Sequence, residues 1–428
     1  MLAANVAARL VALGALSLAT LVVARSGGPA AVGAYALLRV LPSLVGVVCS
    51  AGLPGAIAYF LAGPARSDRR APPTLLAMAV AGGVAGAALW LAATPLLTRA
   101  LFAEVPAALV AAAAVAVATR VLAATAKSCS QGSGDLPGAN RVIVTEELSF
   151  LPAYALVWLA GARGYGAVVG GLVLADLATI ALAWSRLVRR GFFQGAARPS
   201  RALARRIAGY GMRAQVGGVI TLLNLRLDFV LMSVLTSSAV LGVYAVASKY
   251  AELVRVLSVA LGYVLYPRFA SDGPAAAAER ARSLLPRAGL LTAAAVLPLW
   301  VAAGSIVPGI YGSSFDGAVL PARIILLGLV LDGIGGVIIG YLYGVGRPGL
   351  SSAAVAVGLV ATLLFDLLLI PRYAATGGAI ASACAYSIST LALVGFFVRL
   401  TRSSRPGGGD LALSRAEAPL SRGPAEIR

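Results

Sequence analysis

Long apolar segments alternate with short polar connections along almost the whole chain. Twelve of them are long enough to cross a bilayer, which takes about 20 mostly apolar residues. They cover residues 6–24, 33–62, 73–97, 106–126, 143–161, 165–187, 210–234, 239–267, 286–308, 318–344, 350–370 and 375–399. The pattern therefore predicts an all-α membrane protein with about twelve transmembrane helices.

The composition excludes several other classes of protein. Only 12% of the 428 residues are charged and 60% are hydrophobic, whereas soluble domains carry about 25% charged residues. So little polar surface cannot coat a water-exposed domain, which argues against a soluble enzyme, a disordered chain or a collagen-like chain. The first apolar segment lacks a clear small-residue cleavage site, so we expect it to be retained as the first span.

The charges are distributed unevenly between the two sides of the predicted membrane protein. A formal net charge of +19 can indicate nucleic-acid binding, but here the bases concentrate in the connections. Connections after even-numbered segments, with the carboxy-terminal tail, hold 23 bases, and those after odd-numbered segments hold 4. The positive-inside rule then predicts a multi-pass protein of the cytoplasmic membrane with both termini in the cytoplasm. No nucleic-acid partner is expected.

The arginine-rich connection at residues 188–209 divides the segments into two sets of six. We therefore predict an amino-terminal lobe at residues 1–187, a basic cytoplasmic linker at 188–209 and a carboxy-terminal lobe at 210–400. The remaining residues, 401–428, are rich in Gly, Ser, Pro and Arg, a composition typical of a disordered tail.

A short internal repeat supports this division. Gly-Ala-Tyr-Ala at residues 33–36 opens the second segment, and Gly-Val-Tyr-Ala at residues 242–245 opens the eighth, 209 residues later. Because each half contains six spans, both halves face the same way across the membrane. The sequence thus predicts a parallel internal repeat.

The sequence offers no familiar catalytic or metal-binding group. It contains no histidine, and its three cysteines, Cys49, Cys129 and Cys384, lie far apart. No Cys/His site, Ser-His-Asp triad or zinc motif can be formed from these residues. We therefore expect a protein that is not an enzyme and that uses neither a cofactor nor a metal.

Ionisable residues inside the predicted spans are the candidates for function, because charge in hydrocarbon is costly. Lys249, Glu252 and Arg255 recur at every third position of the eighth segment. Residues three apart are neighbours on a helix, so Glu252 could bridge both bases and leave one surplus positive charge. Two interpretations remain open: a self-neutralising network that fastens the lobes together, or a polar stripe facing a water-filled cavity.

Arg39 and Arg226 have no acid within reach on their own helices. Asp228 is two residues from Arg226, and residues two apart do not face each other. Such bases suggest a cavity that holds an anion, and phosphate is the natural candidate because arginine binds it in a bidentate manner. The candidate substrate-binding residues are Arg39, Arg226, Lys249 and Arg255. The candidates for a charge network or ion coupling are Asp228, Glu252 and Asp332.

Other charged residues are expected closer to the membrane surface. Arg120 and Asp176 are predicted to reach an interface by snorkelling, and Glu146 and Glu147 to lie at the cytoplasmic start of the fifth segment. Asp366 is expected near the outer end of the eleventh segment, where it could simply begin a turn.

Several motifs in order along the chain resemble one family of transporters. They include Tyr-Pro-Arg at residues 266–268, Gly-Val-Gly-Arg-Pro at 344–348, Asp-Leu-Leu-Leu-Ile-Pro-Arg-Tyr at 366–373 and Gly-Gly-Ala-Ile-Ala at 377–381. Together with the Gly-Ala-Tyr motif at residue 33, they resemble the polysaccharide-exporting flippases of the multidrug/oligosaccharidyl-lipid/polysaccharide (MOP) superfamily. The resemblance covers nearly all of residues 1–400.

The resemblance implies two six-helix bundles around a central cavity. It also implies alternating access that moves a polyprenyl-pyrophosphate-linked oligosaccharide from the inner to the outer leaflet, in cell-surface polysaccharide biosynthesis. The implied partners are the lipid-linked saccharide and membrane lipid, with functional association with the glycosyltransferases and the polymerase of the same pathway. In such flippases basic residues line the cavity, and by position Arg39, Arg226, Lys249 and Arg255 match them.

Three alternatives are weighed against this one. A drug/cation antiporter of the same superfamily would need acids in the amino-terminal lobe, and the first four segments contain none. A peptidoglycan-precursor (lipid II) flippase is usually longer, often with fourteen spans, and a membrane-bound polymerase or ligase would need a large outward loop. The energy source stays open between the membrane potential and a proton or sodium carried by Asp228, Asp332 or Asp366.

Overall fold

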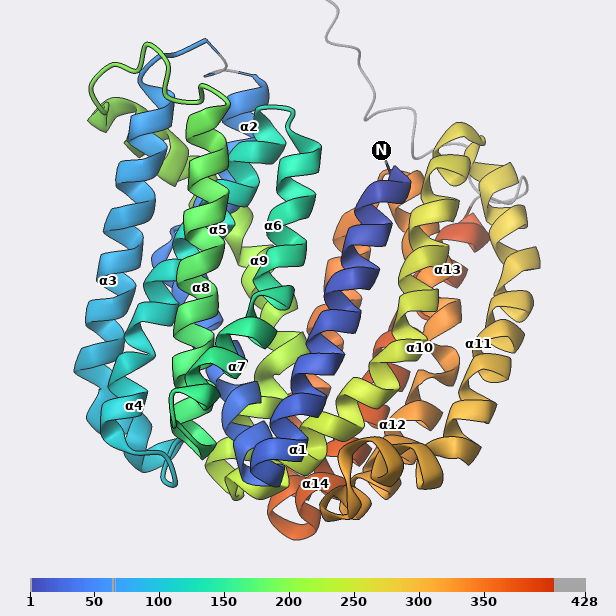
Figure 1. Ribbon diagram of the computed structural model, residues 1–428. Coiled ribbons are helices and arrows are strands. Elements are labelled where there is room, and N and C mark those ends of the chain that lie inside the picture. Colours follow the sequence, from blue (N-terminus) through green and yellow to red (C-terminus); the bar gives the residue numbers. More distant parts are fainter. Residues whose placement is uncertain (1, 64, 66, 404–428) are drawn as a thin grey trace, which may run out of the picture.

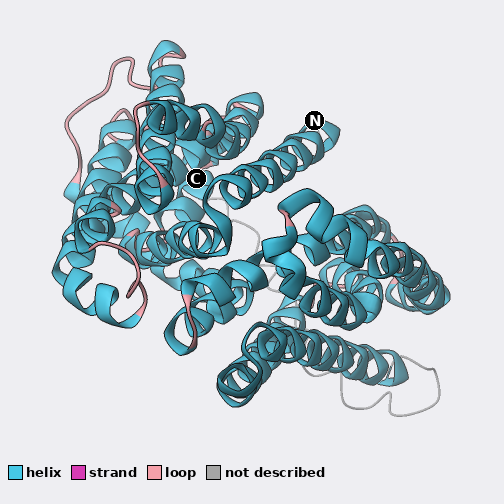
Figure 2. Ribbon diagram, turned by 60° about the horizontal axis from the view of Figure 1, so that its bottom comes forward, coloured by secondary structure: helices cyan, strands magenta, loops and turns pink. Residues whose placement is uncertain are grey.

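The computed structural model describes residues 2–63, 65 and 67–403, and in this part of the chain it contains helices and no strands (Figures 1 and 2). The helices are α1 Leu2–Cys49, α2 Leu53–Ala62, α3 Ala71–Ala100, α4 Ala107–Ala112, α5 Ala114–Gly132, α6 Leu136–Leu148, α7 Phe150–Leu159, α8 Gly164–Arg189, α9 Arg201–Leu235, α10 Ser238–Ser271, α11 Pro274–Tyr311, α12 Val319–Gly328, α13 Asp332–Gly344 and α14 Pro348–Ser403. Two 3₁₀ turns, η1 Ser313–Ala318 and η2 Leu329–Leu331, flank α12.

The helices account for the twelve predicted spans. Among the described residues, nine helical segments are long and apolar enough to cross a membrane. Two of them, in α1 and α14, are interrupted by a non-helical residue, Gly28 and Ala374 respectively, so each comprises two spans. The 35-residue helix α9 is long enough to supply the remaining one. The predicted all-α fold is confirmed.

Glycine and proline explain the breaks in and after α1. Gly28 has a φ of 69°, which glycine adopts without strain, and Pro29 follows it where the second span begins. The predicted unbroken segment at residues 33–62 is wrong, because α1 ends at Cys49 and α2 begins at Leu53. Gly52, with a φ of 72°, makes this second break.

One predicted connection is much shorter in the structure. Residues 268–285 were expected to be a long connection, but only Asp272 and Gly273 separate α10 from α11. The first turns of α11 bury Ala277, Ala278 and Ala281, so its arginines belong to an amphipathic helix rather than to a loop.

The predicted linker and tail also differ in extent. The connection at 188–209 is reduced to residues 190–200. Ser200 caps α9 there by accepting a hydrogen bond from the Leu203 amide at 3.3 Å. In the predicted tail, residues 401–403 belong to α14, and residues 404–428 lie outside the described residues.

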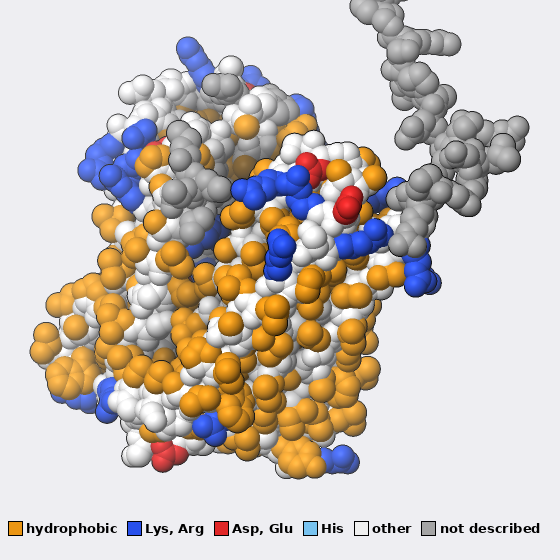
Figure 3. Space-filling model, turned by 90° about the vertical axis from the view of Figure 1, so that its right-hand side faces the viewer, with side chains coloured by type: hydrophobic (Ala, Val, Ile, Leu, Met, Phe, Trp, Pro, Cys, Tyr) orange, Lys and Arg blue, Asp and Glu red, His pale blue; other side chains and the backbone are white. Residues whose placement is uncertain are grey.

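The helices form two groups that diverge toward one end of the molecule (Figure 1). This end carries the connections at residues 133–135, 190–200, 272–273 and 345–347, and we call it the basic end. Lys and Arg side chains gather there above a broad apolar band (Figure 3). Many large apolar side chains of the band are exposed, for example Leu159 at 74% and Leu290 at 72%. Such a surface is suited to lipid, and the protein is a multi-pass membrane protein.

Helix α9 packs against both groups of helices. Near its start, Leu203 and Ile207 are buried with residues of α2 and α3. Near its end, Phe229 and Met232 are buried with Tyr244 of α10, and α9 also packs along α14. A lobe boundary at residue 210 therefore falls within one continuous helix.

The repeat motifs meet where α1 crosses α10, at the end opposite to the basic end. A Cβ atom on Gly33 would lie 1.9 Å from the carbonyl oxygen of Ser238, and one on Gly242 would lie 1.9 Å from that of Pro29. Pro29 and Ser238 are 209 residues apart, as are Gly33 and Gly242. The contact is therefore symmetrical, and it leaves no room for a side chain on either glycine.

Other contacts join the two groups of helices at this end. Arg25 of α1 donates hydrogen bonds to the carbonyl oxygens of Ile310 at 2.7 Å and Gly309 at 2.5 Å, both in α11. The Ser238 amide donates to Glu104, which lies between α3 and α4, at 3.3 Å. The two groups are thus held together at the end opposite to the basic end.

Candidate functional site

Three of the cavities between the described helices contain predicted site residues. The central cavity, of about 260 Å³, lies between α1, α9 and α10 and is lined by Arg39, Arg226 and Lys249 among others. The amino-terminal cavity, of about 250 Å³, lies between α1, α5, α6 and α8 and shares Arg39 with the central one. The carboxy-terminal cavity, of about 520 Å³, lies between α10, α13 and α14 and is lined by Arg255 and others.

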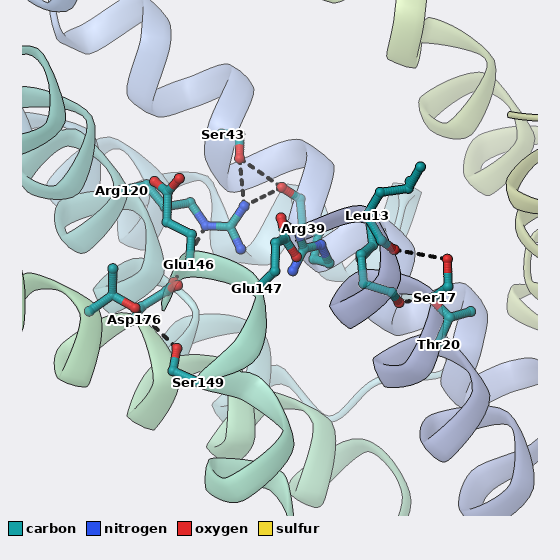
Figure 4. A network of polar contacts seen from close by, with 12 residues as sticks. Leu13, Ser17, Thr20, Arg39, Ser43, Arg120, Glu146, Glu147, Ser149 and Asp176 are labelled. Atoms are coloured by element: carbon teal, nitrogen blue, oxygen red, sulfur yellow. Dashed lines mark hydrogen bonds and ion pairs between the residues drawn. The ribbon is translucent and has the colours of Figure 1, made fainter. Parts of the chain in front are cut away.

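Arg39 is paired with an acid from another helix. Its Nη2 lies 2.6 Å from Oε1 of Glu147 in α6, and its guanidinium lies 5.6 Å from the centre of the Tyr35 ring. Spacing along a single helix indicated no acid for Arg39, and its partner indeed comes from another helix. Glu147, which was expected at the membrane interface, lines the central and amino-terminal cavities. Figure 4 shows the two side chains pointing toward one another.

Arg120 of α5 and Asp176 of α8 form a second pair beside the first. Arg120 Nε lies 3.4 Å from Asp176 Oδ2, and its Nη1 donates to Ser43 Oγ at 2.5 Å and to the carbonyl oxygen of Arg39 (Figure 4). The prediction that these residues snorkel to an interface is wrong. The sequence did contain an indication of this pairing. Arg120 and Asp176 lie at similar distances from the starts of the fourth and sixth segments, which cross the membrane in the same direction.

Glu252 joins two bases on the side of α9 and α10. Lys249 Nζ lies 2.5 Å from Glu252 Oε2, and Arg226 Nη1 lies 3.7 Å from Glu252 Oε1. The sequence predicted a bridge from Glu252 to Lys249 and Arg255. The bond to Lys249 is present, but the second base is Arg226 of the neighbouring helix. Arg255 instead stacks over Tyr386, 5.0 Å from the centre of its ring.

The charges around the central and amino-terminal cavities do not cancel. Glu146 also lines the amino-terminal cavity, and it pairs with Lys127 at 2.8 Å. Among the described residues of these ion pairs, five bases meet four carboxylates, so one positive charge remains. These residues are Arg39, Arg120, Lys127, Arg226, Lys249, Glu146, Glu147, Asp176 and Glu252. The side chains of Lys249, Arg39 and Arg226 keep 11%, 20% and 29% exposure. An anion that enters the central cavity can therefore reach bases whose carboxylates it can replace.

Asp228 and Asp366 lie in the core behind the central cavity. Tyr244 donates a hydrogen bond to Asp228 Oδ2 at 2.5 Å, and its hydroxyl also lies 2.8 Å from Ser382 Oγ. Asp366 is fully buried and close enough to Asp228 for their charges to interact. Neither of its carboxyl oxygens has a hydrogen-bond partner among the described residues. Asp366 lies within a helical stretch of α14, so the expectation that it begins a turn is wrong.

The structure thus separates the predicted site residues into three places. Arg39, Arg226 and Lys249 line the central cavity, and Arg255 and Asp332 line the carboxy-terminal cavity. Glu252 pairs with two of the first group, and Asp228 lies in the core beside Asp366. Sequence reasoning missed Glu147 and the Arg120–Asp176 pair as parts of the site.

Outside the spans, Asp135 anchors the start of α6 to α8. It accepts hydrogen bonds from Arg186 Nε at 2.8 Å and Nη2 at 2.9 Å, and it caps α6 through the Gly138 amide at 3.1 Å. The Arg186 guanidinium holds the pKa of Asp135 below its ordinary value, with further help from the Gly138 amide. This contact stabilises the basic end and belongs to none of the three cavities.

Solved structures of transporters share this architecture. A multidrug resistance MATE family transporter of the MOP superfamily in its inward-facing conformation gives a TM-score of 0.74 at 16% identity, over 94% of this chain and 100% of that one. The lipid II flippase MurJ in an inward closed conformation gives 0.71 at 13%, over 93% and 89%. A MATE family transporter in an outward-facing conformation gives 0.63 at 16%, over 94% and 96%. At these identities the similarity shows a common fold.

The sequence itself identifies the family. None of the curated proteins matches the chain, but the profile of the family described as "Polysaccharide biosynthesis protein" matches residues 22–320, well over half of the sequence. This chain therefore belongs to the polysaccharide biosynthesis protein family and has the fold of the MOP-superfamily transporters.

Proposed function

We propose that the protein moves a polyprenyl-pyrophosphate-linked oligosaccharide from the inner to the outer leaflet of the cytoplasmic membrane. The observation that carries this proposal is the gathering of Arg39, Arg226 and Lys249 around the central cavity, with one positive charge left over in the network. Arginine binds phosphate groups in a bidentate manner, and membership in the polysaccharide biosynthesis family supports a lipid-linked saccharide as the carrier of that phosphate.

When no substrate is bound, carboxylates neutralise most of the positive charge of the central cavity. Glu147 and Glu252 pair with the bases and so reduce the cost of burying them. When a pyrophosphate enters, its oxygens compete for Arg39 and Arg226 and spread its charge over both lobes. The polyprenyl tail needs no site in the cavity, because it stays in lipid.

Alternating access accounts for the direction of movement. The two groups of helices touch at the Gly33–Gly242 crossing and diverge toward the basic end. The higher TM-score with an inward-facing transporter than with an outward-facing one, 0.74 against 0.63, supports a state open toward the basic end. The positive-inside rule places that end and both termini in the cytoplasm, so the substrate is loaded from the inner leaflet.

Asp228 and Asp366 are proposed to couple transport to an ion gradient. A buried carboxylate without a partner is costly, so Asp366 needs a proton or a bound cation as long as it is shielded from water. Rearrangement of α9 against α14 during the transport cycle would change the environment of both acids. Uptake of the ion in one state and release in the other would then drive the conformational change.

A drug/cation antiporter is the second candidate, because Glu147 and Asp176 place two acids inside the amino-terminal lobe. Each is paired with an arginine, which cancels the negative charge that an organic cation needs. A lipid II flippase differs from the proposed function only in the saccharide.

The test is transport in liposomes that contain the purified protein. The probes are a polyprenyl-pyrophosphate oligosaccharide, lipid II and the organic cation tetraphenylphosphonium. We expect movement of the oligosaccharide lipid and a loss of about tenfold or more in Arg226→Gln, since a charge-assisted hydrogen bond contributes about 1.5–3 kcal/mol. The matched control is Arg323→Gln, because Arg323 contacts Trp300 and does not line the central cavity.

The other outcomes would overturn the proposal. Movement of tetraphenylphosphonium without the oligosaccharide lipid would favour the antiporter, and transport of lipid II alone would favour the lipid II flippase. An equal loss of activity in Arg226→Gln and Arg323→Gln would mean that the central cavity has no special part in transport.

A further inference from the structure

The carboxy-terminal cavity is about twice as large as the central one, at about 520 Å³ against 260 Å³. It extends along α10 from Arg255 to Tyr266, a distance of about 16 Å at the helical rise of 1.5 Å per residue. Tyr266 and Tyr343 are 44% and 49% exposed and form an edge-to-face pair at 6.2 Å toward the basic end. The cavity therefore runs from the middle of the bundle toward the basic end.

One wall of this cavity is formed largely by glycine. Gly335, Gly336 and Gly340 of α13 line it together with Gly262 of α10. Gly336 and Gly340 pack against the backbone of α10 and are needed for the helix contact. Gly335 differs, because a Cβ atom added there would meet only Thr390 and Leu393, at ordinary contact distances of 3.4 and 3.6 Å. Space for a ligand is therefore left where a side chain would fit.

Polar groups without strong partners lie at the deep end. Ser258 lines the cavity and is only 4% exposed, yet its hydroxyl has no hydrogen-bond partner in the described part of the chain. Among the described residues, neither Arg255 nor Asp332 forms an ion pair. A buried hydroxyl in this state costs free energy, which a ligand with hydroxyl groups would recover.

The charges of this cavity indicate the class of ligand. Arg255 and Asp332 offset each other, so the site lacks the surplus charge of the central cavity and would not select a free anion or cation. Arginine donates hydrogen bonds, aspartate accepts them, and serine does both. Tyr386 and the Tyr266–Tyr343 pair add ring surfaces. Neutral sugars present many hydroxyl groups together with apolar faces, and they match this lining.

We propose that the carboxy-terminal cavity is a saccharide subsite. It would hold sugar residues of the transported glycolipid while the pyrophosphate occupies the central cavity, so the inference rests on the proposed function. The two cavities are neighbours along α10: Lys249 lines the central one and Arg255 the other, about 9 Å farther along the helix. The subsite would make transport depend on the length of the saccharide.

The experiment compares two substrates in the liposome assay. One is a polyprenyl pyrophosphate that carries a single sugar, and the other carries a tetrasaccharide. Gly335→Leu should fill part of the cavity and reduce transport of the tetrasaccharide lipid about tenfold, which corresponds to 1.4 kcal/mol. Transport of the single-sugar lipid should remain within about twofold of the unmodified protein, since the pyrophosphate site is intact.

Two further variants test the subsite even if Gly335→Leu fails to fold. Asp332→Asn and Ser258→Ala leave the packing in place and should reproduce the length dependence with smaller losses of about threefold to tenfold, the effect of one hydrogen bond. The matched control is Gly395→Leu, because Gly395 is exposed and has open space beside it.

The outcomes separate the two proposals. If the unmodified protein moves neither lipid, the proposed function fails. If it moves both and the cavity variants affect them equally or not at all, the saccharide subsite is wrong and the proposed function stands. Competition by tetraphenylphosphonium that depends on Asp332 would identify a cation site and would also overturn the inference.

Discussion

The amino-terminal and carboxy-terminal cavities are built from equivalent spans of the two halves but have different chemistry. The first lies among the second, fourth, fifth and sixth spans, and the second among the eighth, tenth, eleventh and twelfth. In the first, of about 250 Å³, the arginines are held by carboxylates. In the second, of about 520 Å³, Arg255 and Asp332 form no ion pair among the described residues. The repeat has kept the helix arrangement while the buried side chains diverged.

The difference suggests that the two halves contact different parts of a substrate. Under the proposed function, the paired charges on the amino-terminal side would maintain bases that an anionic head group can use. The unpaired polar groups on the carboxy-terminal side would leave room for uncharged parts of the substrate. The two halves remain alike where they meet, because Gly33 and Gly242 make the same contact in each direction. The following changes test where the halves are equivalent and where they are not.

The largest effect is expected at the crossing of α1 and α10. A methyl group on Gly33 or Gly242 would lie 1.9 Å from a carbonyl oxygen, and overpacking costs about 1–3 kcal/mol. Gly33→Ala and Gly242→Ala should each lower the population of the state closed at this end about 5- to 150-fold. Transport should fall accordingly, and by similar amounts in both variants because the contact is symmetrical.

This shift can be measured by electron–electron double resonance. Spin labels at Arg163→Cys and Ser314→Cys, in a chain without its native cysteines, would report the separation of the halves at this end. Gly14→Ala is the matched control, since Gly14 lies in α1 with open space beside it. An unchanged distance distribution in both crossing variants would show that the contact does not close the protein.

The next largest effect is expected at the Arg39–Glu147 pair. Arg39→Gln leaves Glu147 without its base and should destabilise the protein by about 2–3 kcal/mol. This is below the about 3–5 kcal/mol of fully buried pairs, because both side chains keep some exposure. Adding Glu147→Gln should restore most of the stability but not the transport. Thermal unfolding and the liposome assay measure the two effects. Recovery of transport in the double variant would assign these residues a structural role only.

A smaller effect is expected at Asp366, whose replacement should uncouple transport rather than stop it. Asp366→Asn cannot exchange a proton, so its transport rate should no longer respond to a pH or sodium gradient, while Asp332→Asn should keep the response. We expect a several-fold loss of the gradient-driven rate, which lies within the range of about 50-fold that about 2.3 kcal/mol per charge at 100 mV allows. If the two variants respond alike, Asp366 does not carry the coupling ion.

The smallest effect is expected at Asp135, outside the cavities. Its lowered pKa means that its ionised form stabilises the fold above the unfolded-state value of about 3.9. That stabilisation is lost as the pH falls through the lower folded-state pKa. Asp135→Asn should cost about 1–2 kcal/mol at pH 7, from the weakened contact with Arg186, because asparagine can still cap the helix. The difference in thermal stability from the unmodified protein should shrink in acid, and a constant difference would refute this account.

The number and order of the spans could largely be predicted from the sequence, because hydropathy and the charge of the connections are both local properties. The prediction of a long connection at residues 268–285 was wrong because Arg280 and Arg282 occupy exposed positions of helix α11, which a count of charges does not detect. The symmetrical role of Gly33 and Gly242 was visible only as a four-residue repeat. Their contact depends on how two distant helices cross.

The site was predictable in its bases but not in its pairing. Arg39, Arg226 and Lys249 were identified because charges inside apolar segments are rare. Their partners could not be found by spacing along one helix, since Glu147 reaches Arg39 from α6, and Glu252 reaches Arg226 across α9 and α10. The separate position of Arg255 likewise follows from tertiary packing.

The most direct test of the central claim, that the charged central cavity binds a pyrophosphate head group, is ligand-induced thermal stabilisation. A polyprenyl pyrophosphate without sugar would be added to the purified protein and to Arg39→Gln/Glu147→Gln, with Arg323→Gln as the control. At 100 times the dissociation constant, binding stabilises a protein by about 2.7 kcal/mol. We predict this gain for the unmodified protein and for Arg323→Gln, and about half of it or less for the double variant, since a tenfold weaker affinity leaves about 1.4 kcal/mol. Equal stabilisation of all three proteins would contradict the account.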